Sequence, residues 1–348
     1  MKINRVKLFD PTKQNRPNAI LNGESSGVLN WDDIKYPQFY SIYKSLLANF
    51  WTPFEINMTS DSKQYNSDLS NEERDAFRNI IGLLAILDSV QPKFFSGVQN
   101  YLSDDSIRDA LIVASQQEVV HNHSYSYILS SVEDVKNQDI AFQVARTNKE
   151  VYERNALVID HYEKFLNDNN LDNLIKGLIA SIVLEGINFY SAFAFFYNLA
   201  RYQKMVGAST MISYIQRDEL VHQFLIAQII KLLVEENEDE ISFDVSEFAQ
   251  SLFKEATEKE NEWSRHVLKD IPEIDLDEME GYIKYRANKC LSMINVAPIY
   301  EDVNENSMKW IRAYVSEGED QDLTKTDFFE QKSRQYAKVT DDNGFDDL

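Results

Sequence analysis

The sequence predicts an all-α protein built as a bundle of long helices. Glycine and proline, which mark turns, number only 10 and 7 among 348 residues, and a β-sandwich or a doubly wound α/β fold would need more of them. Apolar residues make up 43% of the chain, which is enough to bury a large core. Along most of the chain these residues recur three and four positions apart, which is the period of an amphipathic helix.

The formal net charge of −22 argues against a surface that binds nucleic acid or an anionic membrane, since both need a basic patch. A single cysteine, Cys290, excludes an internal disulfide and favours a reducing, intracellular compartment. The first residues, MKINRVKLFDPTKQ, lack the apolar core of a secretory signal. We therefore expect a cytoplasmic protein with no nucleic-acid partner and no membrane partner.

The expected helices follow an irregular arm at residues 1–30. The first covers about Tyr36 to Trp51, and the next begins after Ser70, where Glu73 completes a capping box. Pro92 should kink or end this second helix, because a proline inside a helix removes a hydrogen bond. The remaining helices are expected at about 106–129, 138–166, 172–201, 207–235, 245–268 and 277–293, with an acidic loop at 235–240.

The most apolar stretch, about Leu178 to Ala200, is long enough to suggest a transmembrane helix. It contains Glu185, Asn188 and several tyrosines, and we see no second candidate of this kind. A buried core helix that carries a functional polar group is the prediction.

The chain is expected to divide at residue 315 into a helical domain (1–315) and a C-terminal tail (316–348). The tail is polar and charged, with isolated aromatic residues such as Tyr336 and Phe345. Such a composition predicts a mobile segment. It fits either a frayed end or a peptide that docks into a partner.

An internal repeat carries most of the functional information. An acid inside an apolar run is followed, 30 or 34 residues later, by Glu-x-x-His, as expected for neighbouring antiparallel helices. The acids are Asp88 and Glu185, and the motifs are Glu118-Val-Val-His121 and Glu219-Leu-Val-His222. Two buried acids, each followed by a Glu-x-x-His motif, together indicate a specific site. A single Glu-x-x-His in so acidic a chain would mean little.

Residues at i and i+3 lie on one face of a helix, so each Glu-x-x-His can point at one metal ion. One carboxylate from each of two helices, with Glu-x-x-His from each of two others, is the arrangement of ferritin-like di-iron and di-manganese proteins. Four carboxylates would balance two divalent ions, and a ligand set rich in oxygen suits iron or manganese better than structural zinc. We therefore predict a dimetal centre in a four-helix core.

Tyr125 lies four residues after His121 and shares the metal-facing stripe of its helix. A phenol at this position could be oxidised by a metal pair. Phe189, Phe193 and Ile215 fall at helical spacings from the other acids and could form an apolar pocket at the same end of the bundle. The same spacings also fit ordinary core packing.

These stretches resemble the class I ribonucleotide reductase small (β) subunit, a member of the ferritin-like superfamily. The similarity lies in LLAILDSVQ, QQEVVHNHSYSYIL, LEGINFYSAFAFF and IQRDELVH, together with NFWTPFEINM. It implies that Tyr125 bears a stable radical, that Phe189, Phe193 and Ile215 surround it, and that Trp51, Asp218 and Tyr336 form a transfer path. It implies one metal at Asp88, Glu118 and His121 and a second at Glu185, Glu219 and His222.

The resemblance also implies a homodimer whose tail docks into a large catalytic subunit, where ribonucleoside diphosphates are reduced to deoxyribonucleotides. We expect two iron ions, with two manganese ions as the alternative and a flavodoxin-like activase if the metal is manganese. One cysteine cannot support ribose reduction, which agrees with a chain that stores an oxidising equivalent and passes it on. The alternatives are a ferritin-like oxidase of a bound lipid or acyl chain, an iron-storage protein and a helical scaffold without metal.

Overall fold

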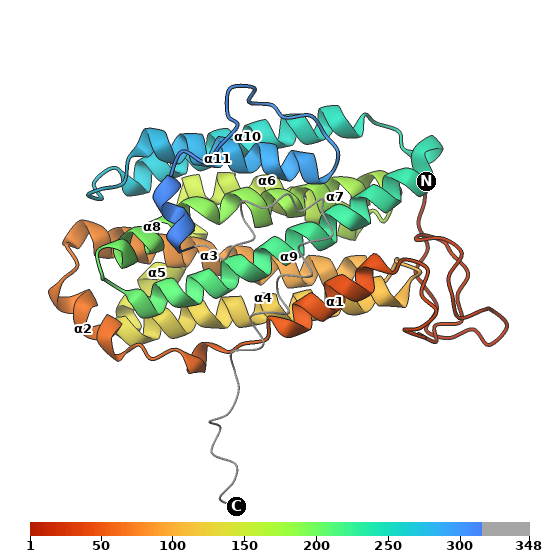
Figure 1. The fold of residues 1–348 in the computed structure, drawn as a ribbon, viewed down its shortest axis with the longest axis horizontal. Helices are drawn as coiled ribbons and strands as arrows, with labels where there is room; N and C mark the ends of the chain where they lie inside the picture. The colour runs from red at the N-terminus through yellow and green to blue at the C-terminus, as the bar shows by residue number, and fades with distance from the viewer. Residues whose placement is uncertain (315–348) are drawn as a thin grey trace, which may run out of the picture.

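The computed structural model describes residues 1–314, and within this range the protein is an assembly of α-helices without a β-sheet (Figure 1). Only two isolated β-bridges occur there, both in contact with the N-terminal arm. The helices are α1 (Gln38–Ala48), α2 (Thr59–Ser67), α3 (Asn71–Val98), α4 (Asp105–Val132), α5 (Val135–Thr147), α6 (Lys149–Asn167), α7 (Leu171–Val183), α8 (Tyr190–Arg201), α9 (Val206–Asn237), α10 (Val245–Leu268) and α11 (Leu276–Met293). The expected all-α bundle is confirmed.

The core is formed by α3 packed along α4, with α7 and α9 beside them. α10 and α11 cover the bundle on one side and α1 lies against α4 on the other, so that α9 runs between the two groups in Figure 1. The irregular arm before α1 gathers at one end of the bundle. This layering keeps the middle of the four core helices away from water.

The beginning of α3 agrees with the sequence. Ser70 Oγ accepts a hydrogen bond from the Glu73 backbone nitrogen at 3.1 Å, and Glu73 Oε2 accepts one from the Ser70 nitrogen at 2.7 Å. Pro92 was expected to kink or end this helix, and it does not end it, because α3 continues to Val98. Tertiary packing against α4 and α5 outweighs the single lost hydrogen bond.

The helix expected at 138–166 is in fact two helices, α5 and α6, which meet at Asn148. This residue adopts an extended conformation, and its side-chain oxygen accepts a hydrogen bond from the Val151 nitrogen at 3.1 Å. An asparagine cap thus begins a new helix where composition suggested continuity. The acidic loop expected at 235–240 is helical instead, since α9 runs on to Asn237 and a 3-10 helical turn, η3 (Glu238–Glu240), follows it directly.

The helix expected at 172–201 is interrupted by a five-residue π-helical turn, η2 (Leu184–Asn188), between α7 and α8. α2 was not foreseen from the sequence at all. Its Asp61 accepts hydrogen bonds from the backbone nitrogens of Gly207 at 3.1 Å and Ala208 at 2.7 Å. Asp61 therefore caps the N-terminus of α9, although the two segments lie far apart in the sequence.

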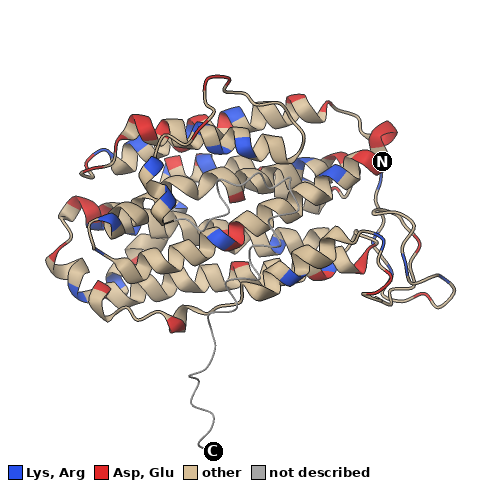
Figure 2. Cartoon of the chain, in the orientation of Figure 1, with Lys and Arg blue, Asp and Glu red and all other residues tan. Residues whose placement is uncertain are grey.

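Two helical stretches are long and apolar enough to cross a membrane, Leu171–Arg201 and also Asn71–Val98, so the expectation of a single candidate was wrong. The most apolar window is fully buried in the first and 61% buried in the second. Both are core helices of the bundle. Acidic and basic residues are interspersed along the outer helices in Figure 2, so the negative charge of the described residues does not form one patch in this view.

Candidate metal centre

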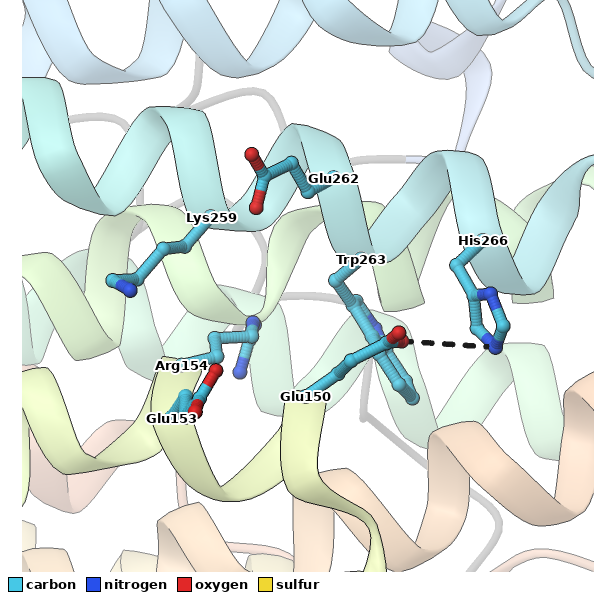
Figure 3. A pocket seen from close by; sticks show the side chains of 7 residues that line it. All are labelled: Glu150, Glu153, Arg154, Lys259, Glu262, Trp263 and His266. Atoms are coloured by element: carbon cyan, nitrogen blue, oxygen red, sulfur yellow. Dashed lines mark ion pairs between the residues drawn. The ribbon is translucent and has the colours of Figure 1, made fainter.

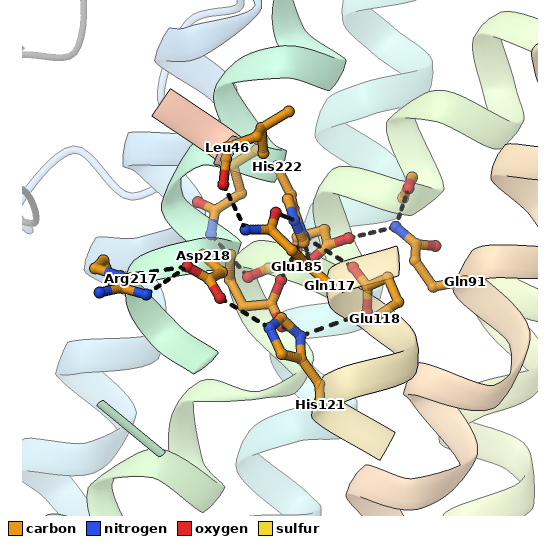
Figure 4. Close-up of polar contacts among 12 residues, drawn as sticks. Leu46, Gln91, Gln117, Glu118, His121, Glu185, Arg217, Asp218 and His222 are labelled. Atoms are coloured by element: carbon orange, nitrogen blue, oxygen red, sulfur yellow. Dashed lines mark hydrogen bonds and ion pairs between the residues drawn. The ribbon is translucent and has the colours of Figure 1, made fainter. Parts of the chain in front are cut away.

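The structure brings the six predicted ligands together in the middle of the bundle. Figure 4 labels four of them, Glu118, His121, Glu185 and His222. Four helical segments supply them: α3 carries Asp88, α4 carries Glu118 and His121, η2 carries Glu185, and α9 carries Glu219 and His222. All six side chains are buried.

Their ligand atoms fall into two groups, and within each group all of them lie within 4.8 Å of one another. One group is Asp88, Glu118, His121 and Glu219, and the other is Glu118, Glu185, Glu219 and His222. Glu118 and Glu219 belong to both groups, whereas the sequence repeat had assigned each of them to one metal. Their positions suit carboxylates that bridge two ions.

Both imidazoles present Nδ1 to the carboxylates. His222 Nδ1 lies 2.8 Å from Glu118 Oε1 and 2.8 Å from Glu219 Oε2, and His121 Nδ1 lies 3.1 Å from Glu219 Oε1. The other ring nitrogens are held from outside the cluster, His121 Nε2 by Asp218 at 3.2 Å and His222 Nε2 by Gln117 at 2.9 Å. Metal-binding histidines are typically oriented by an outer partner of this kind.

The cluster contains buried polar atoms without a hydrogen bond from the described residues. They include both carboxylate oxygens of Asp88 and of Glu118, one oxygen each of Glu185 and Glu219, and His121 Nδ1. Buried polar atoms are nearly always satisfied, so such a concentration needs an explanation. Two divalent ions would satisfy these atoms and balance the four carboxylates.

The protonation equilibria reflect the same crowding. Burial, together with the neighbouring Glu118 carboxylate, raises the pKa of Asp88 well above its usual range. Burial and the carboxylates of Glu219 and Glu118 do the same to Glu185. Burial alone would lower the pKa of His121, but the surrounding carboxylates, Glu219 foremost, outweigh it and raise that pKa. In the absence of metal ions, bound protons must therefore neutralise part of the negative charge of the cluster.

Amide side chains that the sequence reasoning missed hold the ligands in place. Gln91 Nε2 donates to Glu185 Oε1 and to Ser181 Oγ. Gln117 Nε2 donates to the Leu46 carbonyl at 3.1 Å, which leaves its Oε1 for His222. Their only signal in the sequence is proximity to a ligand, three residues after Asp88 and one before Glu118.

Trp51 and Asp218, predicted to lie on a transfer path, meet His121. Trp51 Nε1 donates to Asp218 Oδ2 at 2.8 Å, and His121 Nε2 lies 3.2 Å from the same oxygen. The Trp51 ring stacks on the His121 ring with centroids 6.2 Å apart. Arg217 holds the other oxygen of Asp218 at 3.2 Å. The buried carboxylate therefore links the indole to a candidate metal ligand.

Tyr125 is fully buried beside the cluster. Burial, followed by the Asp88 carboxylate, raises the pKa of its phenol well above the ordinary value. The Asp88 carboxylate is the nearest polar side chain that acts on this hydroxyl. Phe189, Phe193 and Ile215 are buried in the same hydrophobic core, and the two phenylalanine rings are stacked with centroids 5.6 Å apart. The phenol is thus shielded from solvent by the surrounding core.

The predicted transfer residue Tyr336 and the predicted docking tail, 316–348, lie outside the described residues. A separate surface pocket of about 300 Å³ lies between α6 and α10, away from the metal cluster (Figure 3). Its lining residues are Glu150, Glu153, Arg154, Lys259, Glu262, Trp263 and His266.

Fold and site together define a ferritin-like helical protein whose core can hold two metal ions. Comparison with known proteins is more specific. The family model for the ribonucleotide reductase small chain matches residues 28–307, and the chain belongs to this family. The ribonucleoside-diphosphate reductase subunit beta of Halalkalibacterium halodurans is 47% identical, covering 99% of each chain. The Treponema pallidum subunit beta is 35% identical, covering 92% of this chain and 90% of its own.

Solved structures agree with this assignment. The ribonucleotide reductase R2 subunit from Clostridium botulinum has a TM-score of 0.86 and 34% identity, and the match covers 90% of this chain and 99% of that one. Streptococcus sanguinis dimanganese(II)-NrdF shares the fold, with a TM-score of 0.72 at 24% identity over 82% of this chain and 99% of that one. The resemblance and the activity expected from it are confirmed, and the alternative of a lipid or acyl oxidase is not supported.

Proposed function

We propose that this small subunit uses its dimetal site to oxidise Tyr125 to a stable radical, which is passed on to a large catalytic subunit for reduction of ribonucleoside diphosphates. The observation that carries the proposal is the position of the Tyr125 phenol, which is fully buried and close to the Asp88 carboxylate of one ligand group. Bound as a redox-active pair, the metals would supply the oxidising equivalent from oxygen. The apolar surroundings from Phe189, Phe193 and Ile215 would keep water from the radical.

The proposed ligands are the six buried residues, with Glu118 and Glu219 shared between the two ions. Asp88 and His121 would complete one site, and Glu185 and His222 the other. We propose iron as the physiological metal, because oxygen-rich ligands with imidazole suit it. Manganese is the alternative, supported by the dimanganese state of the Streptococcus sanguinis relative, and a flavodoxin-like activase would then be needed.

Transfer out of the site is proposed to run from Tyr125 past the metal ligand His121 to Asp218 and Trp51. In this arrangement the carboxylate holds both rings, and a proton can stay on the His121–Asp218 pair while an electron moves. Tyr336 is proposed as the relay to the large subunit, with residues 316–348 as the docking segment. We also propose a homodimer that acts in the cytoplasm.

The decisive experiment is electron paramagnetic resonance of the protein loaded with Fe(II), or with Mn(II) and its activating system, and then oxidised. A tyrosyl radical should form in the wild type and be absent in Tyr125→Phe. Tyr197→Phe is the matched control, since this tyrosine is equally buried but donates to Gln216 elsewhere in the core. A radical that survives in Tyr125→Phe would contradict the assignment.

The role of the tail is tested by truncation after Asp320. The radical should form as in the full chain, while reductase activity with the large subunit should be lost. Full activity of the truncated protein would show that the docking assignment is wrong.

A further inference from the structure

The π-helical turn η2 (Leu184–Asn188) carries Glu185 into the centre of the bundle. A π-helical turn contains an additional residue within a helix, and such turns disturb the regular pattern of backbone hydrogen bonds. Here three carbonyls of the turn accept hydrogen bonds from side chains on other helices. The donors are Gln223 on α9, Arg286 on α11 and Arg154 on α6.

Arg286 and Gln223 hold the beginning of the turn together. Gln223 Nε2 donates to the Glu185 carbonyl at 2.8 Å, and Arg286 Nε donates to the Gly186 carbonyl at 3.4 Å. Arg286 Nη2 also donates to Gln223 Oε1 at 2.8 Å. Because a guanidinium only donates, this bond turns the oxygen of the Gln223 amide toward Arg286 and its NH2 group toward the Glu185 carbonyl.

Arg154 holds the other end of the turn. Its Nη2 donates to the Asn188 carbonyl, and its Nε donates to Glu260 Oε2 on α10 at 2.6 Å. Glu260 also accepts a hydrogen bond from Ser191, at the beginning of α8. Arg154 is also one of the residues that line the pocket between α6 and α10, where Figure 3 labels it. The turn is thus bracketed by two buried arginines from different helices.

The backbone of the turn is closely packed at Gly186, where a side chain would not fit. A Cβ added at Gly186 would lie 2.2 Å from Cys290 Sγ and 3.3 Å from Gln223 Oε1. α11 therefore packs directly against the backbone of the turn. The Arg286 guanidinium also lies 3.9 Å from the centre of the Tyr190 ring, two residues beyond the turn.

Stability alone does not explain this arrangement. Arg286 is 1% exposed and Arg154 is 3% exposed, and burying a guanidinium carries a large desolvation cost. Apolar side chains of similar volume often stabilise a core as well or better than a buried charged group. The hydrogen bonds from both arginines converge on the backbone of the single turn that carries Glu185.

We propose that Arg286, acting with Gln223, and Arg154, acting with Glu260, are positioning residues that fix Glu185 in the ligand group of the second metal ion. The inference rests on the proposed function. Metal–ligand distances tolerate errors of only about 0.2 Å, so a turn free to relax toward regular α-helix would carry the carboxylate out of reach. The other group, Asp88, Glu118, His121 and Glu219, takes no ligand from the turn and should be spared.

The test is Arg286→Met, which keeps the unbranched, apolar stem of the side chain and removes the guanidinium with its hydrogen bonds. Mn(II) binding to full-length protein is measured by equilibrium dialysis, and the spectroscopic signature is the ratio of isolated to exchange-coupled Mn(II) in the electron paramagnetic resonance spectrum. Wild type should bind two coupled ions per chain. The variant should bind its second ion about 10- to 100-fold more weakly and show the six-line signal of an isolated ion, with the first ion retained.

Arg78→Met is the matched control, because Arg78 on α3 also pairs with another segment, at Glu133, and its other ion pair, with Asp75, lies within α3 and not at η2. It should behave as wild type, as judged by both readouts and by circular dichroism. If Arg286→Met does not fold, Gln223→Met decides, since it removes the bond to the Glu185 carbonyl and leaves the guanidinium.

Two coupled ions bound with wild-type affinity in the folded variants would overturn the inference, as would an equal loss in Arg78→Met. Failure of the wild type to bind two ions would instead refute the proposed function, and the inference with it.

Discussion

At the scale of single residues, the contact between Trp51 and Asp218 lets the proposed transfer path be tested separately from radical formation. Trp51→Phe removes the indole N–H that binds Asp218 Oδ2. A buried carboxylate that loses a donor is costly, so the free energy of unfolding should fall by about 2–3 kcal/mol. The Tyr125 radical should still form, whereas activity with the large subunit should drop to background.

Trp31→Phe is the matched control, because Trp31 is also a tryptophan in a stacked aromatic pair, but its partner is Tyr43 and not a ligand of the metal cluster. It should retain activity. Equal activity of both variants in an assay with the large subunit would remove Trp51 from the path.

His161 predicts a dependence of stability on pH that is independent of the metal site. Partial burial, with Lys164 and Lys176 nearby, lowers the pKa of His161 to about 4 in the folded protein. Between that pH and about 6.5, the unfolded chain binds a proton that the folded chain does not, so stability is lost as the pH falls through this window. After allowance for solvent screening, the loss is on the order of 1–2 kcal/mol.

Urea unfolding of metal-free protein at pH 7 and pH 4.5 measures this effect. His161→Phe should lose less free energy of unfolding than wild type when the pH is lowered from 7 to 4.5. His123→Phe, a change at an exposed position of α4, should lose as much as wild type. A pH dependence unchanged by His161→Phe would contradict the assignment.

At the scale of helices, Pro92 lies four residues after the candidate ligand Asp88 in α3. It has no N–H to donate to the Asp88 carbonyl, so the helix is weakened beside the metal site. Pro92→Ala should restore that bond and raise the free energy of unfolding by about 1–3 kcal/mol. Lys93→Ala, at the exposed neighbouring position, should change it by less than about 0.5 kcal/mol. Urea titration compares them, and a less stable Pro92→Ala would mean that packing of the ring outweighs the lost bond.

The helices also show which features a sequence can reveal. The capping box at Ser70 and Glu73 could be predicted because its partners are three residues apart, and the same holds for each Glu-x-x-His. The break at Asn148 could not, because asparagine inside a helix and asparagine at a cap look alike until packing decides. The turn η2 was missed since its partners Arg154, Gln223 and Arg286 come from three other helices.

The site shows the same limit. Spacing brought out all six candidate ligands, yet the sharing of Glu118 and Glu219 between two groups depends on how α4 and α9 are rotated against each other. Repeats along a chain carry no such information.

At the scale of the whole molecule, the candidate ligands Asp88 and His222 are brought together only by folding. Ions that bind this cluster bind the folded state alone, and each site contributes about 2.7 kcal/mol when the free metal is at 100 times its dissociation constant. Calorimetry should therefore show a melting temperature higher by about 5 °C or more with Mn(II) than with a chelator.

Glu118→Gln should abolish this metal-dependent rise, because Glu118 belongs to both groups. Without metal the variant should melt above wild type, since one buried negative charge is gone. If Glu118→Gln is less stable than wild type when both are measured with a chelator, the carboxylates of the metal-free cluster do not repel one another as we infer.

Because each ligand group draws on both halves of the chain, the order of synthesis has a consequence for maturation. A ribosome releases Asp88, Glu118 and His121 well before Glu219 is made, so the nascent chain carries a half-built set of acids that no metal pair can yet neutralise. Loading of both ions must therefore wait until the chain has been made at least as far as His222. A chain that ends before Glu219 lacks a ligand of both groups, so it cannot assemble either site of the pair however much metal surrounds it.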